Sequence, residues 1–185
     1  MKEKFGVIFG RFQPFHNGHL EHVLTPLHEC DFLYIGITNP DNKLMQYDES
    51  DSNRSLKSSN PYSYFHRHEM IKNTLLDLNI SLSRFDIIPF PINYPGLILN
   101  YSPKEAIYYI TVLTTDRNNN WNYKKKEILA SLNLKTKIIK NKRLTSSSEI
   151  RKRMREAKNW ADLVPNTVYN YILKNNLILR DDENE

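Results

Sequence analysis

Short apolar runs alternate along this chain with segments whose apolar residues recur at helical spacing, and this alternation limits the folds it can adopt. Residues 5–9 predict a first buried strand, and residues 31–38 predict a second. The segment between them repeats apolar residues along one helix face: Leu20, Val23, Leu24 and Leu27. A helix is therefore expected from about residue 18, and Pro26 is expected to kink or end it. A strand, a helix and a strand in this order predict parallel strands joined by a right-handed crossover.

The alternation continues through the rest of the chain. Further strands are expected over residues 85–90, 108–114 and 137–140. Further helices are expected over residues 61–78, 122–132, 147–157 and 165–174. The expected buried face of the helix over 61–78 comprises Phe65, Met70, Ile71, Leu75 and Leu78. Residues 39–60 are polar and predict a long surface loop. We therefore predict one α/β domain over residues 1–185, a doubly wound, Rossmann-like sheet of about five parallel strands with a frayed acidic tail from about residue 179.

The amino-acid composition limits the classes of protein to which this chain can belong. With 39% hydrophobic residues, the 185-residue chain can bury a core, and no apolar run reaches the length of a membrane span. Its single cysteine, Cys30, cannot form an internal disulfide, which favours a reducing compartment and predicts a cytoplasmic protein. The net charge of +5 suits an anionic partner, but an ordinary lysine-rich surface would give the same value.

Residues 10–19, GRFQPFHNGH, connect the first strand to the first helix. In a parallel sheet, ligands bind at the carboxyl ends of the strands, and the free N–H groups at a helix start favour an anion. His16 and His19 are three residues apart, so both rings can face one phosphate, and Arg11 adds a planar set of donors. The first glycine would let the backbone pass close to a ligand, and the second would let the helix start tightly. The pattern predicts a phosphate-transfer site; the alternative is that the histidines only cap the helix.

Residues 145–151, TSSSEIR, have the features of a second anion site. Ser146 and Glu149 have the spacing of a capping box that opens a helix. The serine hydroxyls and backbone N–H groups, with Arg151 one turn into the helix, can surround an anion. Alone, this segment would be a plain helix cap beside a surface arginine; together with residues 10–19 it favours nucleotide binding.

These motifs resemble the signatures of a known enzyme superfamily. HNGH matches the HxGH signature of the nucleotidyltransferases, and TSSSEIR resembles their ISxTxIR signature. The longer string GRFQPFHNGHL is similar to the archaeal-type nicotinamide-mononucleotide adenylyltransferases, and so is NPYSYFHRHEMI, which lies between the two motifs. The resemblance extends over about residues 4–177.

The resemblance implies an enzyme that joins AMP from ATP to nicotinamide or nicotinic acid mononucleotide and releases pyrophosphate. It assigns catalysis to Arg11, His16, His19 and Arg151. The nucleotide would contact a larger set: Gly10, Arg11, Phe12, His16, Gly18, His19, Thr115, Asp116, Ser146, Ser147, Ser148 and Arg151. Mg²⁺ is the expected cofactor, held by the phosphates of the nucleotide and not by the protein.

The acceptor half departs from the family pattern. An acidic residue expected after the third strand is absent, and about Leu99 occupies the position of a ring-stacking tryptophan. Tyr94, Tyr101 or Trp121 could replace it as the surface that packs on a pyridine ring. A different phosphorylated acceptor, with CTP or ATP, therefore stays open.

Other classes of site fit less well. His16, His19, His22, His28 and Cys30 cluster in the sequence, but their spacing turns around a helix and does not predict a zinc site. His22 is expected at the surface or the core edge, and lysines 124–126 on a solvated helix face. The alternative from another class is a non-catalytic nucleotide- or RNA-binding domain, although no nucleic-acid motif is present. No specific nucleic acid and no membrane is expected as a partner, and association into a homo-oligomer is left open.

Overall fold

The computed structural model describes residues 2–47, 49, 55–113, 120–141 and 145–180. These residues form a sheet of five parallel strands in the order β3-β2-β1-β4-β5. The strands are β1 (Glu3–Gly10), β2 (Cys30–Ile37), β3 (Phe85–Pro89), β4 (Ile107–Leu113) and β5 (Lys135–Asn141). The predicted α/β, doubly wound fold is confirmed. Most of the predicted frayed tail, residues 181–185, lies outside the described residues.

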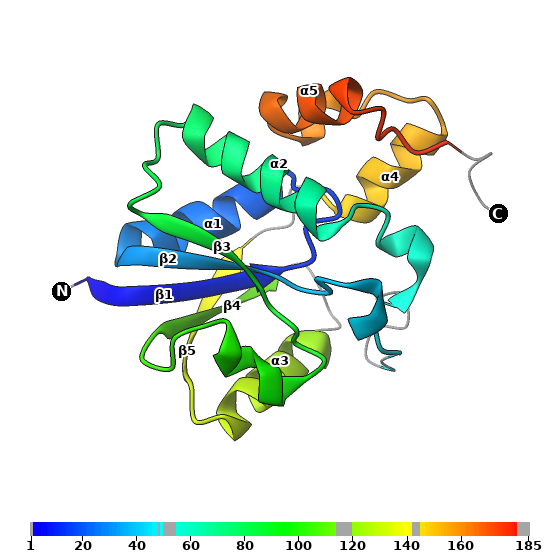
Figure 1. Ribbon diagram of the computed structural model, residues 1–185. Coiled ribbons are helices and arrows are strands. Elements are labelled where there is room, and N and C mark those ends of the chain that lie inside the picture. Colours follow the sequence, from blue (N-terminus) through cyan, green and yellow to red (C-terminus); the bar gives the residue numbers. More distant parts are fainter. Residues whose placement is uncertain (1, 48, 50–54, 114–119, 142–144, 181–185) are drawn as a thin grey trace.

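Helices cover both faces of this sheet (Figure 1). One face carries α1 (Asn17–Glu29), α2 (Tyr64–Asp77), α4 (Ser147–Arg155) and α5 (Asn166–Lys174), and the other carries α3 (Asn120–Ser131). The alternation of side chains along β1 supplies both cores, because successive residues of a strand point to opposite faces. Ile8 packs into the core beneath α1 and α2, whereas Val7 and Phe9 pack into the core on the α3 side.

Short 3₁₀ helices occupy the connections. They are η1 (Asn42–Leu44), η3 (Lys57–Ser59), η4 (Pro95–Asn100) and η5 (Ala161–Leu163). The described part of the predicted loop over 39–60 therefore contains the helical turns η1 and η3. Among the described residues, no helix is long and apolar enough to cross a membrane.

The buried face of α2 differs from the prediction. Its buried residues are Arg67, Met70, Ile71, Thr74 and Leu75, which follow one stripe of the helix. Phe65 lies off this stripe and is 63% exposed, and Leu78 follows the end of the helix and is 46% exposed. A buried arginine therefore takes part in the face that sequence hydrophobicity assigned to Phe65.

Pro26 was expected to kink or end the first helix; α1 continues past it and ends at Glu29, so the helix does not end at this proline. Pro26 lies in the last turn. The backbone N–H of Cys30 donates to the Pro26 carbonyl, and its Sγ donates to the same oxygen at 3.1 Å. These two hydrogen bonds keep the last turn closed after the proline.

Candidate active site

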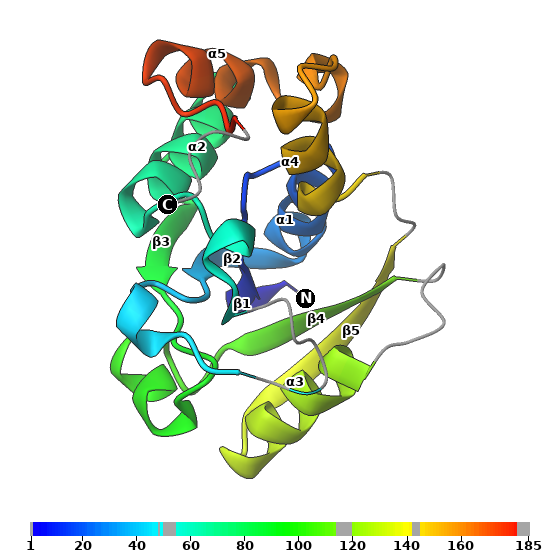
Figure 2. The same ribbon diagram turned by 90° about the vertical axis from the view of Figure 1, so that its right-hand side faces the viewer.

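A pocket of about 260 Å³ opens at the carboxyl end of the sheet, beside β1 and β4. The strand order reverses here, because β2 lies on one side of β1 and β4 on the other. Figure 2 looks toward these strand ends and shows α1 and α4 on one side of the sheet and α3 on the other. The pocket is lined by the turn after β1, the first turns of α1, Thr38, the middle of β4, the first turns of α3 and the start of α4. The position is the one where ligands bind in open α/β sheets.

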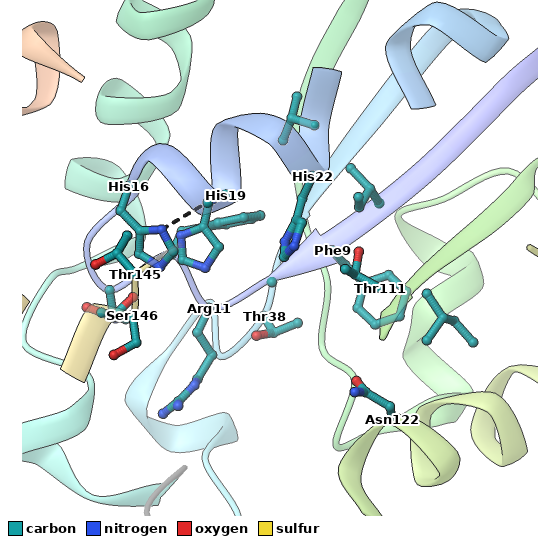
Figure 3. A pocket seen from close by; sticks show the side chains of 18 of the residues that line it. Phe9, Arg11, His16, His19, His22, Thr38, Thr111, Asn122, Thr145 and Ser146 are labelled. Atoms are coloured by element: carbon teal, nitrogen blue, oxygen red, sulfur yellow. Dashed lines mark hydrogen bonds between the residues drawn. The ribbon is translucent and has the colours of Figure 1, made fainter. Parts of the chain in front are cut away.

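The two histidines of the first motif lie side by side in this pocket (Figure 3). The rings of His16 and His19 are stacked, with their centroids 3.6 Å apart. His16 is the N-cap of α1, and its Nδ1 accepts a hydrogen bond from the backbone N–H of His19 at 3.2 Å. An accepting Nδ1 carries no proton, so a neutral His16 has its proton on Nε2. The capping role and the pocket position thus occur together in one residue.

The ring of His19 is uncharged at neutral pH. Burial lowers its pKa well below the usual value, and the charges of His16, His22 and Arg11 act in the same direction. Nδ1 of His19 has no accessible surface and no hydrogen-bond partner of acceptable geometry among the described residues, although the nearby Pro14 carbonyl offsets part of the pKa shift. A buried polar atom without a protein partner is uncommon.

Gly18 makes room for the stacked rings. A Cβ at this position would lie 3.2 Å from Cε1 and 3.3 Å from Nδ1 of His16. Phe12 lies in the same turn, is 2% exposed and adopts φ = 53°. Its ring meets the His19 ring edge-on, with the ring centroids 5.0 Å apart. A bulky residue with positive φ is rare and needs support from the surrounding structure.

Hydrogen bonds join the two sequence motifs. Arg151 donates from Nη1 to the Gln13 carbonyl at 2.7 Å, and Ser147 donates from its hydroxyl to the Pro14 carbonyl at 3.2 Å. The Gln13 side chain in turn bonds both backbone groups of Tyr62, at 2.9 Å each. The start of α4 is therefore fastened to the turn after β1, although these segments are more than 130 residues apart in the sequence.

The start of α4 confirms part of the predicted cap. The backbone N–H of Glu149 donates to the Ser146 hydroxyl at 3.2 Å. The Glu149 carboxylate accepts from Arg153 at 2.8 Å, so it does not complete a capping box. Arg151 is buried, and burial lowers its pKa to about 10, which leaves it charged at neutral pH. One of its donors serves the Gln13 carbonyl, while its Nε has no hydrogen-bond partner among the described residues.

The arginines and the lysine among the described lining residues give the pocket a positive charge. Arg11, Lys125 and Arg151 line it, and none of the described lining residues is an aspartate or a glutamate. In the part of the chain that the structure describes, no group of three or more His, Cys, Asp and Glu side chains is arranged to hold a metal ion. This donor set of cations, imidazoles, hydroxyls and amides suits a polyanion.

The predicted nucleotide-binding residues come together with two exceptions. Gly10, Phe12 and the serines 146–148 line the pocket with the four predicted catalytic residues and Gly18. Thr115 and Asp116 lie outside the described residues. Their predicted contact with the nucleotide stays a prediction.

The predicted acceptor residues are not brought to this pocket. Tyr94, Leu99 and Tyr101 lie on or beside η4, and Leu99 and Tyr101 are 40% and 45% exposed. Trp121 lies in the first turn of α3 and packs against the core on that face. None of the four is among the described residues that line the pocket. Their role in acceptor binding stays a prediction that the pocket does not support.

Sequence reasoning missed several lining residues: Thr38, His22, Thr111, Asn122 and Lys125. Lys125 was expected on a solvated helix face, but its ammonium lies 5.7 Å from the centre of the Phe9 ring and donates to Asn122 at 3.2 Å. His22 was expected at the surface or core edge, and burial lowers its pKa to about 4, with Lys125 adding to the shift. Its place three residues after His19 was the available signal, because residues three apart share a helix face.

Comparison with known proteins agrees with this geometry. The cytidylyltransferase-like family model matches residues 7–153. The phosphonoformate cytidylyltransferase of Streptomyces viridochromogenes is 34% identical over 165 residues, which cover 88% of this chain and 87% of that protein. The nicotinamide-nucleotide adenylyltransferase of Saccharolobus solfataricus is 33% identical over 175 residues, which cover 91% and 90%.

Solved structures share the fold. A bifunctional NMN adenylyltransferase/ADP ribose pyrophosphatase from Francisella tularensis superposes with a TM-score of 0.62 at 16% identity, covering 95% of this chain and 54% of that one. Thermotoga maritima TmcAL bound with alpha-thio ATP gives 0.65 at 13% identity, covering 95% and 56%. This chain thus spans about half the length of those two structures. With the family model and both sequence relatives matching most of its length, the chain belongs to the cytidylyltransferase-like family of nucleotidyltransferases.

Proposed function

We propose that this protein transfers a nucleotidyl group from a nucleoside triphosphate to a phosphate or phosphonate oxygen of a small acceptor. The observation that carries the proposal is the convergence of both sequence motifs on one cationic pocket at the carboxyl end of β1. In the proposed step, the acceptor oxygen attacks the α-phosphorus in line, and the bond to the pyrophosphate oxygen breaks. No covalent enzyme intermediate is required.

The described side chains suit stabilisation of charge. The Nε2–H of His16 and the neutral ring of His19 would act as donors at the α-phosphate, where negative charge builds up in the transition state. Arg151 and the N-terminus of α4 would receive the β- and γ-phosphates. Mg²⁺, when bound, would neutralise phosphate charge; since the described lining offers it no carboxylate, its ligands would be phosphate oxygens and water.

The described pocket favours an acceptor without a pyridine ring. The aromatic side chains predicted to pack on such a ring do not line it, and the relative from Streptomyces is named for a small phosphonate. Transfer of CMP from CTP to a small phosphonate or phosphate acid is therefore our first candidate reaction. Transfer of AMP to a pyridine mononucleotide, our prediction from the sequence, is the second, supported by adenylyltransferase relatives at 26–33% identity.

A substrate matrix tests the proposal. Purified protein with Mg²⁺ would meet ATP, CTP, GTP or UTP, each with phosphonoformate, nicotinamide mononucleotide, nicotinic acid mononucleotide, phosphopantetheine and simple sugar phosphates. Pyrophosphate release would be followed and the products identified by mass. The His19→Ala variant, purified identically, controls for contaminating enzymes. Nucleotidyl product from the wild type but not from this variant is the expected result. Absence of product across the matrix would contradict the proposed reaction for these acceptors.

A further inference from the structure

Arg67 is the most completely buried charged side chain of the described residues that carries no role so far. It lies on α2 and is 2% exposed. Its guanidinium donates four hydrogen bonds, all to backbone carbonyls. The acceptors are Ser63 at 3.2 Å, Arg11 at 2.9 Å, Thr38 at 2.7 Å and Asn39 at 2.7 Å. A guanidinium has five N–H donors in a fixed plane, so one side chain can hold three separate segments at once.

Two of these carbonyls belong to residues that line the pocket. Arg11 follows β1 and Thr38 follows β2, and both side chains are drawn in the pocket in Figure 3. A single nitrogen of Arg67, Nη1, bonds both carbonyls. The two turns are also joined directly, because the Thr38 N–H donates to the Gly10 carbonyl at 2.9 Å. The direct bond and the two bonds from Arg67 together hold Arg11 and Thr38 in position.

Thr38 itself has the features of a ligand-contacting residue. It is 1% exposed, and its Oγ1 is buried without a hydrogen-bond partner among the described residues. A buried hydroxyl without a partner is costly, and a phosphate oxygen in the pocket would remove that cost.

We propose that Arg67 is a positioning residue, which holds the backbone of Arg11 and Thr38 so that the guanidinium of one and the hydroxyl of the other meet a phosphate group of the substrates. The inference rests on the proposed function, since it assigns a task to residues of the same pocket. Lysine cannot replace arginine in this role, because one ammonium cannot reach carbonyls on three segments in a plane.

The chain contains a matched control at the opposite end of β2. Arg84 also clamps backbone carbonyls, donating to Asp31 at 2.8 Å, to Leu27 at 2.7 Å and to Cys30 at 3.0 Å. Those carbonyls lie in the last turn of α1 and at the amino end of β2, away from the pocket. Loss of the clamp should lower stability in both Arg67→Lys and Arg84→Lys, whereas only the first should alter the pocket.

The experiment compares these two variants with the wild type at a temperature where all three are folded. Melting temperature, the Kd for ATP and CTP, and the kcat and KM of pyrophosphate release would be measured. We expect Arg67→Lys to weaken nucleotide binding or raise KM at least tenfold, and Arg84→Lys to stay within twofold of the wild type. Thr38→Val should reproduce part of the loss, and Thr38→Ser should restore it. The double variant Arg67→Lys/Thr38→Val should be little worse than Arg67→Lys, because both changes act on one contact.

Equal Kd and KM values in the two arginine variants would overturn the inference, and so would identical behaviour of Thr38→Val and Thr38→Ser. If Arg67→Lys fails to fold, the two threonine variants still decide whether the Thr38 hydroxyl meets the phosphate, which the inference requires. If the wild type binds nucleotide but transfers nothing, the proposed reaction fails, while the comparison of Kd values still decides the role of Arg67. If it transfers but the arginine variants match, the reaction stands and the inference falls.

Discussion

Replacing His16 by asparagine separates the two roles that the structure gives this residue. His16 caps α1 through Nδ1, 3.2 Å from the His19 N–H, and it lines the pocket with its ring. Asparagine is among the preferred N-cap residues, and its side-chain oxygen can accept from the same N–H. The substitution therefore keeps the cap but removes the Nε2–H donor. His16→Ala removes both.

The two losses have different magnitudes. Loss of an N-cap costs about 1 kcal/mol, which in a chain of this size lowers Tm by roughly 2–4 °C. Loss of one preorganised donor to a transition state lowers kcat by about 10²–10³. We expect His16→Asn to keep Tm within about 1–2 °C of the wild type while its kcat falls about a hundredfold or more. His16→Ala should lose the same kcat and also about 2–4 °C of Tm.

Calorimetry and a pyrophosphate-release assay would measure both quantities on the same samples. Near-full turnover in His16→Asn, with a lowered Tm in His16→Ala, would mean that His16 only caps the helix. That result would refute the assignment of His16 to the reaction and leave His19 as the remaining imidazole donor.

Two further predictions concern stability. A Cβ at Gly36 of β2 would lie 2.7 Å from the Phe90 Cβ, and Phe90 stacks on the pocket residue Phe9. Gly36→Ala should therefore lower the free energy of unfolding by about 1–3 kcal/mol in urea denaturation, whereas Gly96→Ala, with no atom within 4 Å, should change it by less than about 0.5 kcal/mol. Equal stability of the two variants would contradict the close contact of Phe90 with Gly36. His22 has a pKa of about 4 in the folded protein and about 6.5 in the unfolded chain, so the unfolded chain binds the proton first as the pH falls. This residue should therefore make the protein about 2 kcal/mol less stable at pH 5 than at pH 7. A His22→Gln variant should lose that part of the pH dependence, and an unchanged dependence of the unfolding free energy on pH would show that the ring is not desolvated.

The fold was predictable because its determinants are local and repeated. The run before Gly10 and the helical spacing after Gly18 mark the first strand and helix, and the same periods recur to residue 174. The boundaries moved by a few residues at most. The prediction failed at Phe65, because a hydrophobic side chain was assumed to face the core; in the structure Phe65 is exposed, and the buried stripe of α2 includes Arg67.

The sequence by itself determined the family and the chemical character of the site. GRFQPFHNGH and TSSSEIR carry the residue types and spacings that predict a phosphate site. A short spacing such as that of His16 and His19 also determines which side chains share a helix face. The same reasoning applies to the cap at Ser146, since a cap involves only its neighbours in the chain.

Only the tertiary structure decided how distant segments meet. The contacts of Arg151 with Gln13 and of Arg67 with Thr38, and the entry of Lys125 into the pocket, depend on strand order and crossover geometry. A local pattern does not record which segments the sheet will bring together, because hydrogen bonds between remote residues leave no periodicity in the sequence. For the same reason Tyr94 and Tyr101, chosen by their position along the chain, lie away from the pocket that the strands create.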